Sequence, residues 1–258
     1  MTHSDIQDAN VSVVYLCYND AGSIAHCVTQ CIKELSPSVR QLEIIVVEDG
    51  STDGSNSILR DLQMQHRCLD VIWHERNQGY GASLSDGILR ARNEFILCSD
   101  GDGQFKIEDF YRLFDDMADG VDIVGGSRSP RADESYRRLF GNVFNAIVRS
   151  LLAPDLDDVD CGFKLFRASS IKRLLPVKSR MAVWVEIMHS ARKRAYKCKS
   201  VPVRHLPRCV GRSTAFTWSN IVILVSELCS ILTEHWSPTH SDEELNAHSA
   251  ATAKNGIK

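Results

Sequence analysis

LEIIVVEDGSTDG, residues 42–54, joins a continuous apolar run to an acidic turn that contains serine, threonine and glycine. A short apolar run without polar alternation is typical of a strand buried on both faces of a parallel sheet. Three further runs have this character: VSVVYL at 11–16, LDVIWH at 69–74 and EFILCS at 94–99. The four runs predict an α/β fold in which helices flank a mostly parallel sheet.

Helices are expected between these runs, at 23–35, 55–65 and 80–92, where apolar residues recur at helical spacing or a turn precedes the stretch. Beyond residue 120 the pattern is less regular. The elements expected there are strands at 121–126, 162–168 and 198–203 and helices at 136–152, 169–175 and 182–194. Around one folded domain over 11–215 we expect a flexible N-terminus over 1–10 and a disordered tail over 237–258.

FTWSNIVILVSELCSILTEHW, residues 216–236, is the most apolar stretch of the chain, but serines and two glutamates, Glu227 and Glu234, interrupt it. These interruptions argue against a membrane span. Its apolar residues recur at helical spacing, which predicts an amphipathic helix. Such a helix either packs on the core or lies at a membrane surface, and the sequence leaves both alternatives open.

The start of the chain, MTHSDIQDAN, lacks the basic and apolar segments of a secretory signal. We therefore expect a cytoplasmic protein, either free or bound peripherally to the cytoplasmic face of a membrane. The nine cysteines are irregularly spaced and include no paired metal-binding motif, so we expect reduced thiols. Cys27 and Cys31 lie on one helical stripe of apolar residues, which indicates a packing role.

The net charge of -3 hides a strong asymmetry along the chain. Residues 1–159 carry 14 lysines and arginines against 26 acidic residues, whereas residues 160–215 carry 14 against two, Asp160 and Glu186. A basic block of this density is either a solvated face or a surface for an anionic partner. Nucleic acid is a poor candidate because no nucleic-acid-binding motif is present and the acidic part would repel a polyanion.

Acidic turns follow three of the predicted strands: YND at 18–20, EDGSTDG at 48–54 and DGDGQ at 100–104. Each turn alone is an ordinary feature of a loop. In an open parallel sheet, however, ligands bind beyond the carboxyl ends of the strands. The three turns therefore predict one acidic binding site at that edge.

Asp100 and Asp102 have the spacing to face one hard cation, and Gln104 can add a neutral oxygen. A calcium loop of the EF-hand type is excluded, because Phe105 and Tyr111 stand where it needs glycine and glutamate. Mg²⁺ or Mn²⁺ held by so few protein ligands completes its shell with water and substrate phosphates. This pattern points to a nucleoside diphosphate, and the absence of G-x-G-x-x-G and P-loop motifs argues against a dehydrogenase or a P-loop NTPase.

Six motifs occur in order: V-S-V-V-x-x-x-Y-N-D, V-V-E-D-G-S-T-D-G, R-N-x-G-Y-G-A, D-G-D-G-Q, G-G-S-R and D-x-D-C-G-F-K-L-F. Over residues 11–215 the chain resembles the inverting family 2 glycosyltransferases of GT-A fold. It is most similar to the branch of dolichol-phosphate mannose synthases and polyprenyl-phosphate glycosyltransferases. The resemblance implies a nucleotide-sugar half over 11–128, an acceptor half over 129–215, and metal-dependent transfer from a GDP- or UDP-sugar to a polyprenyl or dolichyl phosphate.

The resemblance also implies roles for individual residues. The matching positions are Tyr18, Asp20, Asp49 and Ser51 for the base and ribose; Arg76 and Gly79 for the segment closing over the nucleotide; Asp100, Asp102 and Gln104 for the metal and diphosphate; and Arg128 and Arg208 for phosphate groups, with Arg212 and Ser213 beside them. Asp102, Arg128 and Arg208 are expected to act in catalysis by stabilising charge on the leaving group. Leu16 and Glu48 depart from the usual family residues, so the base is left open.

The acceptor is the other open question. A lipid monophosphate, with a second pKa of about 6, is largely a dianion at neutral pH and needs cations, which the basic block supplies. A hydroxyl acceptor on a sugar or small molecule needs a general base, for which Asp160 and Glu186 are the candidates. Both also suit structural ion pairs. A non-catalytic sugar-nucleotide-binding subunit is a further alternative, which the intact D-x-D-x-Q set disfavours; a homo-oligomer is left open.

Overall fold

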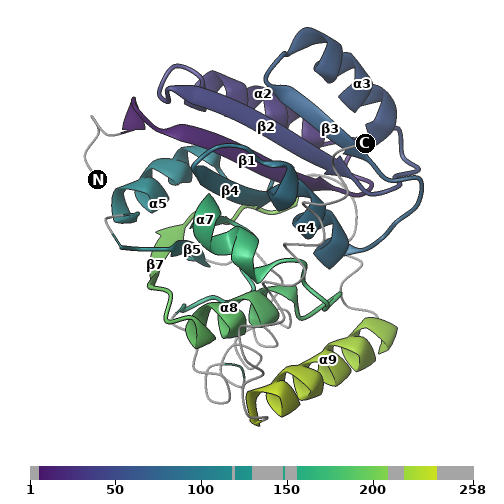
Figure 1. The fold of residues 1–258 in the computed structure, drawn as a ribbon. Coiled ribbons are helices and arrows are strands. Elements are labelled where there is room, and N and C mark those ends of the chain that lie inside the picture. Colours follow the sequence, from purple (N-terminus) through teal and green to yellow (C-terminus); the bar gives the residue numbers. More distant parts are fainter. Residues whose placement is uncertain (1–5, 118–119, 130–147, 149–155, 209–217, 237–258) are drawn as a thin grey trace, which may run out of the picture.

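The computed structural model describes residues 6–117, 120–129, 148, 156–208 and 218–236. Strands in these residues form one sheet with the order β3-β2-β1-β4-β6-β5-β7 (Figure 1). The strands are β1 (Asn10–Cys17), β2 (Gln41–Glu48), β3 (Leu69–Trp73), β4 (Phe95–Asp100), β5 (Ile123–Arg128), β6 (Lys164–Arg167) and β7 (Cys198–Val203). The runs that were identified in the sequence thus form strands, with boundaries shifted by a few residues.

The sheet is mostly parallel, as predicted. β1 pairs in parallel with β2 and β4, β2 with β3, and β5 with β7. β6 runs antiparallel to both of its neighbours, β4 and β5. Because β6 reverses direction between them, β5 and β7 point the same way as β1 and β4.

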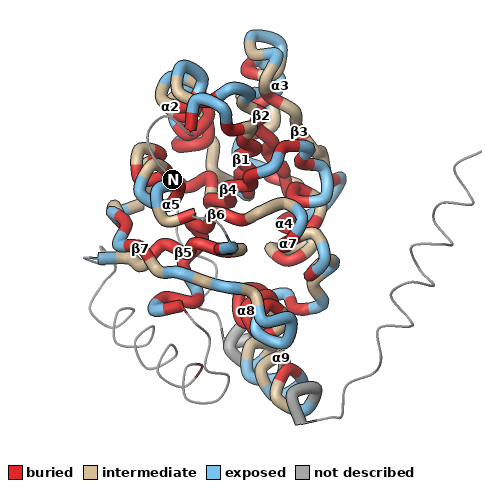
Figure 2. The backbone as a smooth tube through the Cα atoms, turned by 60° about the vertical axis from the view of Figure 1, so that its left-hand side comes forward, coloured by how far each residue is buried: buried red, intermediate tan, exposed pale blue. Residues whose placement is uncertain are grey.

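Helices cover both faces of the sheet. They are α2 (Ile24–Leu35), α3 (Ser55–Gln65), α4 (Tyr80–Arg90), α5 (Phe110–Asp116), α7 (Ala168–Ile171), α8 (Val183–Lys193) and α9 (Trp218–Trp236), with 3-10 turns at Ile107–Asp109 and Lys172–Leu174. Successive strand residues alternate between the faces, so Val13 and Ile44 pack with α2, α3 and α5, whereas Val14 and Ile45 pack with α4 and α8. Figure 2 shows the resulting buried centre.

The C-terminal helix α9 packs on the second of these faces. Its Ile231 is buried, and Leu224, Leu228 and Leu232 are partly buried against the same core. The other side of the helix exposes apolar surface, since Val222 and Val225 are 58% and 54% exposed. No helix in the described part of the chain is long and apolar enough to cross a membrane.

Several details differ from the sequence-based expectation. Ile6 and Ala9, placed in a flexible N-terminus, are buried in the core. The helix expected at 169–175 divides into α7 and a 3-10 turn, and α5 was not predicted. The described cysteines form no disulfide with one another. Apart from the buried Val148, the helix expected at 136–152 lies outside the described residues, as does the tail at 237–258.

Candidate active site

The loops after β1, β2 and β4 meet at one edge of the sheet, because these strands are adjacent and parallel. The carboxyl groups of Asp20, Asp100 and Asp102 lie close enough at this edge for their charges to interact. Burial, with the charges of Asp102 and Asp20, raises the pKa of Asp100 from 3.8 to about 7. Burial likewise raises the pKa of Asp20 to about 6, with a contribution from Asp102 that Arg208 partly offsets. The edge therefore concentrates more negative charge than it can easily hold without a cation.

Asp102 is buried and forms an ion pair with Arg208. Its Oδ2 accepts hydrogen bonds from Nη2 and Nε of Arg208, at 2.6 and 3.2 Å, and its Oδ1 accepts from the Gln104 N–H at 3.0 Å. The Gln104 side chain donates to the carbonyl oxygen of Leu206 at 3.0 Å. The segment ending at Arg208 is thus held against the D-x-D turn, and the guanidinium lies where a positive charge is needed.

Asp100 is held by a hydrogen-bond chain that the sequence analysis missed. Tyr80 donates its hydroxyl proton to Asp100 Oδ1 at 3.0 Å, and the Trp184 ring N–H donates to the Tyr80 oxygen at 3.2 Å. The ammonium of buried Lys164 lies 4.2 Å from the centre of the Trp184 ring. Gly162 permits the close approach on the other side, because a Cβ there would collide with Asp100 Oδ2. These contacts fix the orientation of the carboxylate.

Asp49 joins the loops after β2 and β3 through hydrogen bonds. This buried carboxylate accepts hydrogen bonds from the N–H groups of Gln78 and Gly79, at 2.7 and 3.0 Å. It also lies 2.7 Å from Nδ1 of His74, whose Nε2 lies 3.1 Å from Asp86. Asp49 therefore positions the segment that was expected to close over the nucleotide, a role visible only from the folded chain.

The remaining residues expected on the nucleotide side lie around the same loops. Ser51 Oγ accepts from the Asn19 N–H at 3.0 Å, and the Ser51 N–H donates to buried Glu48 at 2.6 Å. Tyr18 is 40% exposed next to Asp20, and Arg76 is exposed. Both side chains are accessible to a ligand.

Arg128 is engaged by a carboxylate. It forms a bidentate pair with buried Asp158, with its Nε and Nη2 at 2.7 and 2.8 Å from the two oxygens. Burial alone would lower the pKa of Arg128, but the hydrogen bonds and charge of Asp158 raise it above its ordinary value. The pair ties the end of β5 to the loop before β6.

The two acidic residues of the basic block occupy different environments. The carboxylate of Glu186 accepts hydrogen bonds from the N–H groups of Lys178 and Ser179, at 2.9 and 2.7 Å. Asp160 is exposed, and its charge contributes to the raised pKa of Asp100, after burial, Asp102 and Asp20. Arg212 and Ser213 lie outside the described residues.

The donor set suits a hard divalent cation whose shell is completed by other ligands. Within the described residues no three His, Cys, Asp or Glu side chains are grouped to hold a metal ion. Asp100 and Asp102 are two carboxylates at a site of excess negative charge, and Arg208 already neutralises one of them. Such a pair fits Mg²⁺ or Mn²⁺, which keep water and phosphate ligands.

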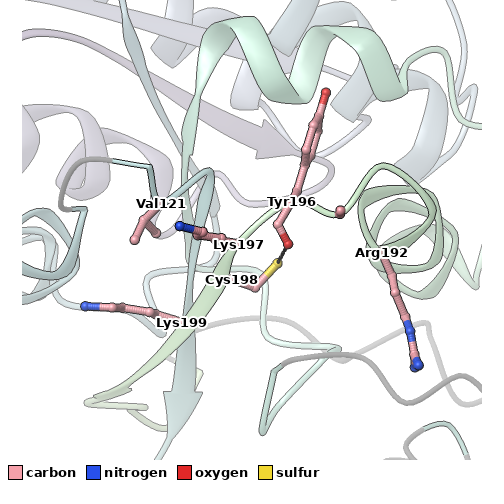
Figure 3. Close-up of a pocket in the computed structure, with 7 residues that line it drawn as sticks. Val121, Arg192, Tyr196, Lys197, Cys198 and Lys199 are labelled. Carbon is pink, nitrogen blue, oxygen red and sulfur yellow. Dashed lines mark hydrogen bonds between the residues drawn. The ribbon is translucent and has the colours of Figure 1, made fainter.

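A pocket of about 550 Å³ lies at the opposite edge of the sheet, near the starts of β5 and β7. Arg192, Lys197 and Lys199 surround it with Tyr196, as Figure 3 shows. Lys199 pairs with Asp116 at 2.9 Å, and both side chains are nearly half exposed. Because ligands of open parallel sheets bind at the carboxyl edge, this pocket is not the candidate active site.

Comparison with known proteins identifies the family of this chain. The model of the family described as Glycosyl transferase family 2 matches residues 12–175. An undecaprenyl-phosphate 4-deoxy-4-formamido-L-arabinose transferase of Edwardsiella ictaluri (strain 93-146) is 28% identical over 225 residues, which cover 86% of this chain and 68% of the relative. A dolichyl-phosphate beta-glucosyltransferase of Dictyostelium discoideum is 28% identical over 208 residues, 73% of this chain and 64% of the relative.

Solved structures with low sequence identity share the fold. Glucosyl-3-phosphoglycerate synthase from Mycobacterium tuberculosis, in complex with Mn²⁺, UDP and phosphoglyceric acid, gives a TM-score of 0.69 at 15% identity, covering 90% of this chain and 82% of that chain. Mannosyl-3-phosphoglycerate synthase from Rubrobacter xylanophilus gives 0.65 at 14% identity, covering 91% and 78%. The expected GT-A type of fold is thereby confirmed.

Proposed function

Because the chain belongs to glycosyl transferase family 2 and is a glycosyltransferase, we propose that it transfers a sugar from a nucleoside diphosphate to a polyprenyl or dolichyl phosphate. The observation that carries the proposal is the pair of half-buried Asp100 and buried Asp102 at the carboxyl edge, with Arg208 bound to Asp102. The names of two relatives, an undecaprenyl-phosphate transferase and a dolichyl-phosphate glucosyltransferase, support the lipid phosphate acceptor.

We further propose that Asp100, Asp102 and Gln104 hold Mg²⁺ or Mn²⁺ together with the donor diphosphate. The bound ion would neutralise the negative charge that develops on the departing diphosphate. The chain prepares this site through Tyr80, which orients Asp100, and through the Gln104 N–H, which orients Asp102. A related fold that contains Mn²⁺ and UDP supports the assignment.

Transfer with inversion places the acceptor oxygen on the face of the anomeric carbon opposite the leaving group. The new bond forms from an oxygen of the lipid phosphate as the bond from the sugar to the nucleoside diphosphate breaks. The acceptor is largely dianionic at neutral pH, because its second pKa is about 6, so no protein base has to remove a proton. Arg208, which bonds to Asp102 in the structure, would stabilise phosphate charge by exchanging that bond for a substrate phosphate.

The engagement of Glu186 supports a phosphate acceptor over a hydroxyl acceptor. Both of its oxygens accept backbone hydrogen bonds, so it is poorly placed to remove a proton from an acceptor. The test is product analysis with UDP- and GDP-sugars, using polyprenyl phosphate and the matching polyprenol as acceptors, with Mn²⁺ or EDTA. We expect metal-dependent product only with the phosphate. Transfer to polyprenol alone, or turnover in EDTA, overturns the proposal.

We also propose that the protein binds peripherally to a membrane through α9. Val222 and Val225 give the outer side of this helix an apolar character, whereas the Glu227 carboxylate faces the protein and bonds to residues 180–182. Vesicles of phosphatidylcholine with phosphatidylglycerol should carry the protein upward in a flotation gradient at low salt and release it at high salt. Protein that stays in the soluble fraction at every salt concentration contradicts this role.

A further inference from the structure

The loop before α8 is held by two carboxylates from different helices. Glu186 of α8 accepts hydrogen bonds from two consecutive backbone N–H groups of the loop, and Glu227 of α9 accepts from the next three. The N–H donors and their distances are Lys178 at 2.9 Å and Ser179 at 2.7 Å to Glu186, then Arg180 at 2.7 Å, Met181 at 2.9 Å and Ala182 at 2.9 Å to Glu227. Five consecutive N–H groups therefore donate to carboxylates, which are strong acceptors, and the loop is fixed in one conformation.

The fixed loop lies against the start of α4, which belongs to the candidate active site. A Cβ on Gly81 would collide with the carbonyl oxygen of Ser179, so the two backbones are in direct contact. Nε of Arg180 lies 3.7 Å from the position of a Cβ on Gly79. The Gly79 N–H in turn bonds to Asp49, and the next residue, Tyr80, bonds to Asp100. The Arg180 side chain thus lies beside the segment Gly79–Tyr80, which bonds to both Asp49 and Asp100.

Arg180 differs from the two arginines that the sequence singled out. The guanidinium of Arg128 is paired with Asp158 and that of Arg208 with Asp102. Arg180 is exposed, and its guanidinium forms no hydrogen bond or ion pair with any residue that the structure describes. A guanidinium that lies beside the site without a protein carboxylate is suited to a bidentate contact with phosphate.

We propose that Arg180 binds a phosphate group of the substrates, and that Glu227 is a positioning residue that presents it from α9. This inference rests on the proposed transferase function. The phosphate belongs either to the donor diphosphate or to the lipid acceptor, since both offer the same oxygens to a guanidinium. Because Glu227 is part of α9, the helix that we propose to meet the membrane also sets the position of this cation.

The first test compares Arg180→Ala with Arg173→Ala, which removes an exposed arginine from the 3-10 turn Lys172–Leu174. Calorimetric titration in Mn²⁺ measures the affinity for UDP and GDP and for the corresponding nucleosides. If Arg180 contacts the donor, its loss should weaken nucleoside diphosphate binding about 10-fold and leave nucleoside binding unchanged. If it contacts the acceptor, nucleotide affinity should persist while KM for polyprenyl phosphate rises about 10-fold. Arg180→Lys should recover only part of either loss.

The inference is overturned if Arg180→Ala matches Arg173→Ala both in nucleoside diphosphate affinity and in KM for polyprenyl phosphate. The nucleotide titration measures binding, so its outcome is separate from the proposed function. If the wild-type protein binds UDP or GDP but transfers no sugar, the proposed transfer reaction is wrong, and the donor contact of Arg180 can still be measured. Wild-type protein that binds neither nucleotide and uses no polyprenyl phosphate overturns both.

The second test concerns Glu227. Glu227→Gln keeps the size of the side chain, and Glu227→Ala removes the acceptor; both should reproduce part of the phosphate-specific loss. In a double-mutant cycle, Glu227→Ala should add little to Arg180→Ala in phosphate affinity, because the residue that it positions is gone. If its effect adds in full, or if it lowers only Tm, Glu227 supports the fold alone and the positioning role is wrong.

Discussion

The two edges of the sheet use charged side chains in different ways. At the carboxyl edge, Glu48, Asp49 and Asp102 are buried and each accepts a hydrogen bond from a backbone N–H group. At the opposite edge, Lys199 and Asp116 form a pair in which the side chains are 45% and 46% exposed. Breaking a buried interaction leaves a charge without compensation, whereas an exposed pair contributes only about 0–1 kcal/mol. Substitutions at the two edges should therefore differ in both activity and stability.

The largest effect is expected for Asp102→Asn. The substitution exchanges a carboxylate for a weaker neutral ligand at the proposed metal site, and turnover should fall about 100-fold or more while the fold is kept. Steady-state kinetics with Mn²⁺ and circular dichroism measure the two properties. Asp116→Asn at the opposite edge is the matched control and should keep wild-type turnover. Normal rates for Asp102→Asn in EDTA-treated buffer contradict the metal assignment.

Lysine replacements should separate the two paired arginines. Arg208→Lys should lower kcat about 10-fold, because lysine cannot give a bidentate contact to phosphate. Arg128→Lys should lower the free energy of unfolding by about 1–3 kcal/mol, because it breaks the bidentate contact with buried Asp158. Urea unfolding and kinetics on both variants test this division. Equal effects of the two variants on kcat and on stability would show that the division is wrong.

Tyr80→Phe should weaken metal binding without removing a ligand. The variant loses the hydroxyl that orients Asp100, and loss of such outer partners typically costs about 10-fold in metal affinity. Electron paramagnetic resonance of free Mn²⁺ gives the affinity in the absence of donor. Tyr111→Phe, which removes a hydroxyl that bonds to Glu34 on α2, is the control and should bind Mn²⁺ normally. An unchanged Mn²⁺ affinity in Tyr80→Phe contradicts the orienting role.

The carboxyl edge should also make the metal-free protein sensitive to pH. The pKa of Asp100 is raised from 3.8 to about 7, so the folded state favours the protonated form. This contribution to stability is present at low pH and is lost as the pH rises through about 7. The Tm of EDTA-treated protein should therefore fall between about pH 4 and pH 7 and level off above pH 7, and Asp100→Asn should reduce that fall. Mn²⁺ binding should strengthen over the same interval, since protons compete for the carboxylate.

The smallest effect is expected at the pocket of the opposite edge. Lys197→Ala and Lys199→Ala should change turnover less than about 2-fold and the free energy of unfolding by about 0.5 kcal/mol, because both side chains are exposed. Kinetics and urea unfolding of the double variant provide the comparison. A loss of activity comparable to that of Arg208→Lys would mean that the pocket takes part in the reaction.

Much of the fold was predictable because burial leaves a local signature. The apolar runs that form β1, β2, β3 and β4 are readable without any partner, and the acidic turns follow directly from where the strands end. The direction of β6 was not predictable, since a four-residue strand gives the same pattern in either orientation. Helix α9 could be identified by its period, but only the folded chain shows that Leu224, Leu228 and Ile231 face the core.

The candidate site divides in the same way. Asp100, Asp102 and Gln104 are adjacent in sequence, so their spacing alone indicated a metal site. The roles of Tyr80, Trp184 and Glu227 were missed, because each contact joins residues that are far apart along the chain. Glu227 appeared as an interruption of an apolar stretch, whereas in the fold it caps the loop that carries Arg180.

By itself the sequence determined the α/β class, the acidic turns and the unequal charge of the two parts of the chain. Tertiary structure alone decided which charges neutralise one another. Cations of the basic block meet carboxylates of the acidic part in the pairs Arg167–Glu94, Lys199–Asp116, Arg204–Asp109 and Arg208–Asp102. The physical reason is that backbone periodicity is a local property, whereas an ion pair requires two side chains within about 4 Å. Which arginines remain available to a substrate phosphate is therefore settled only when the chain has folded.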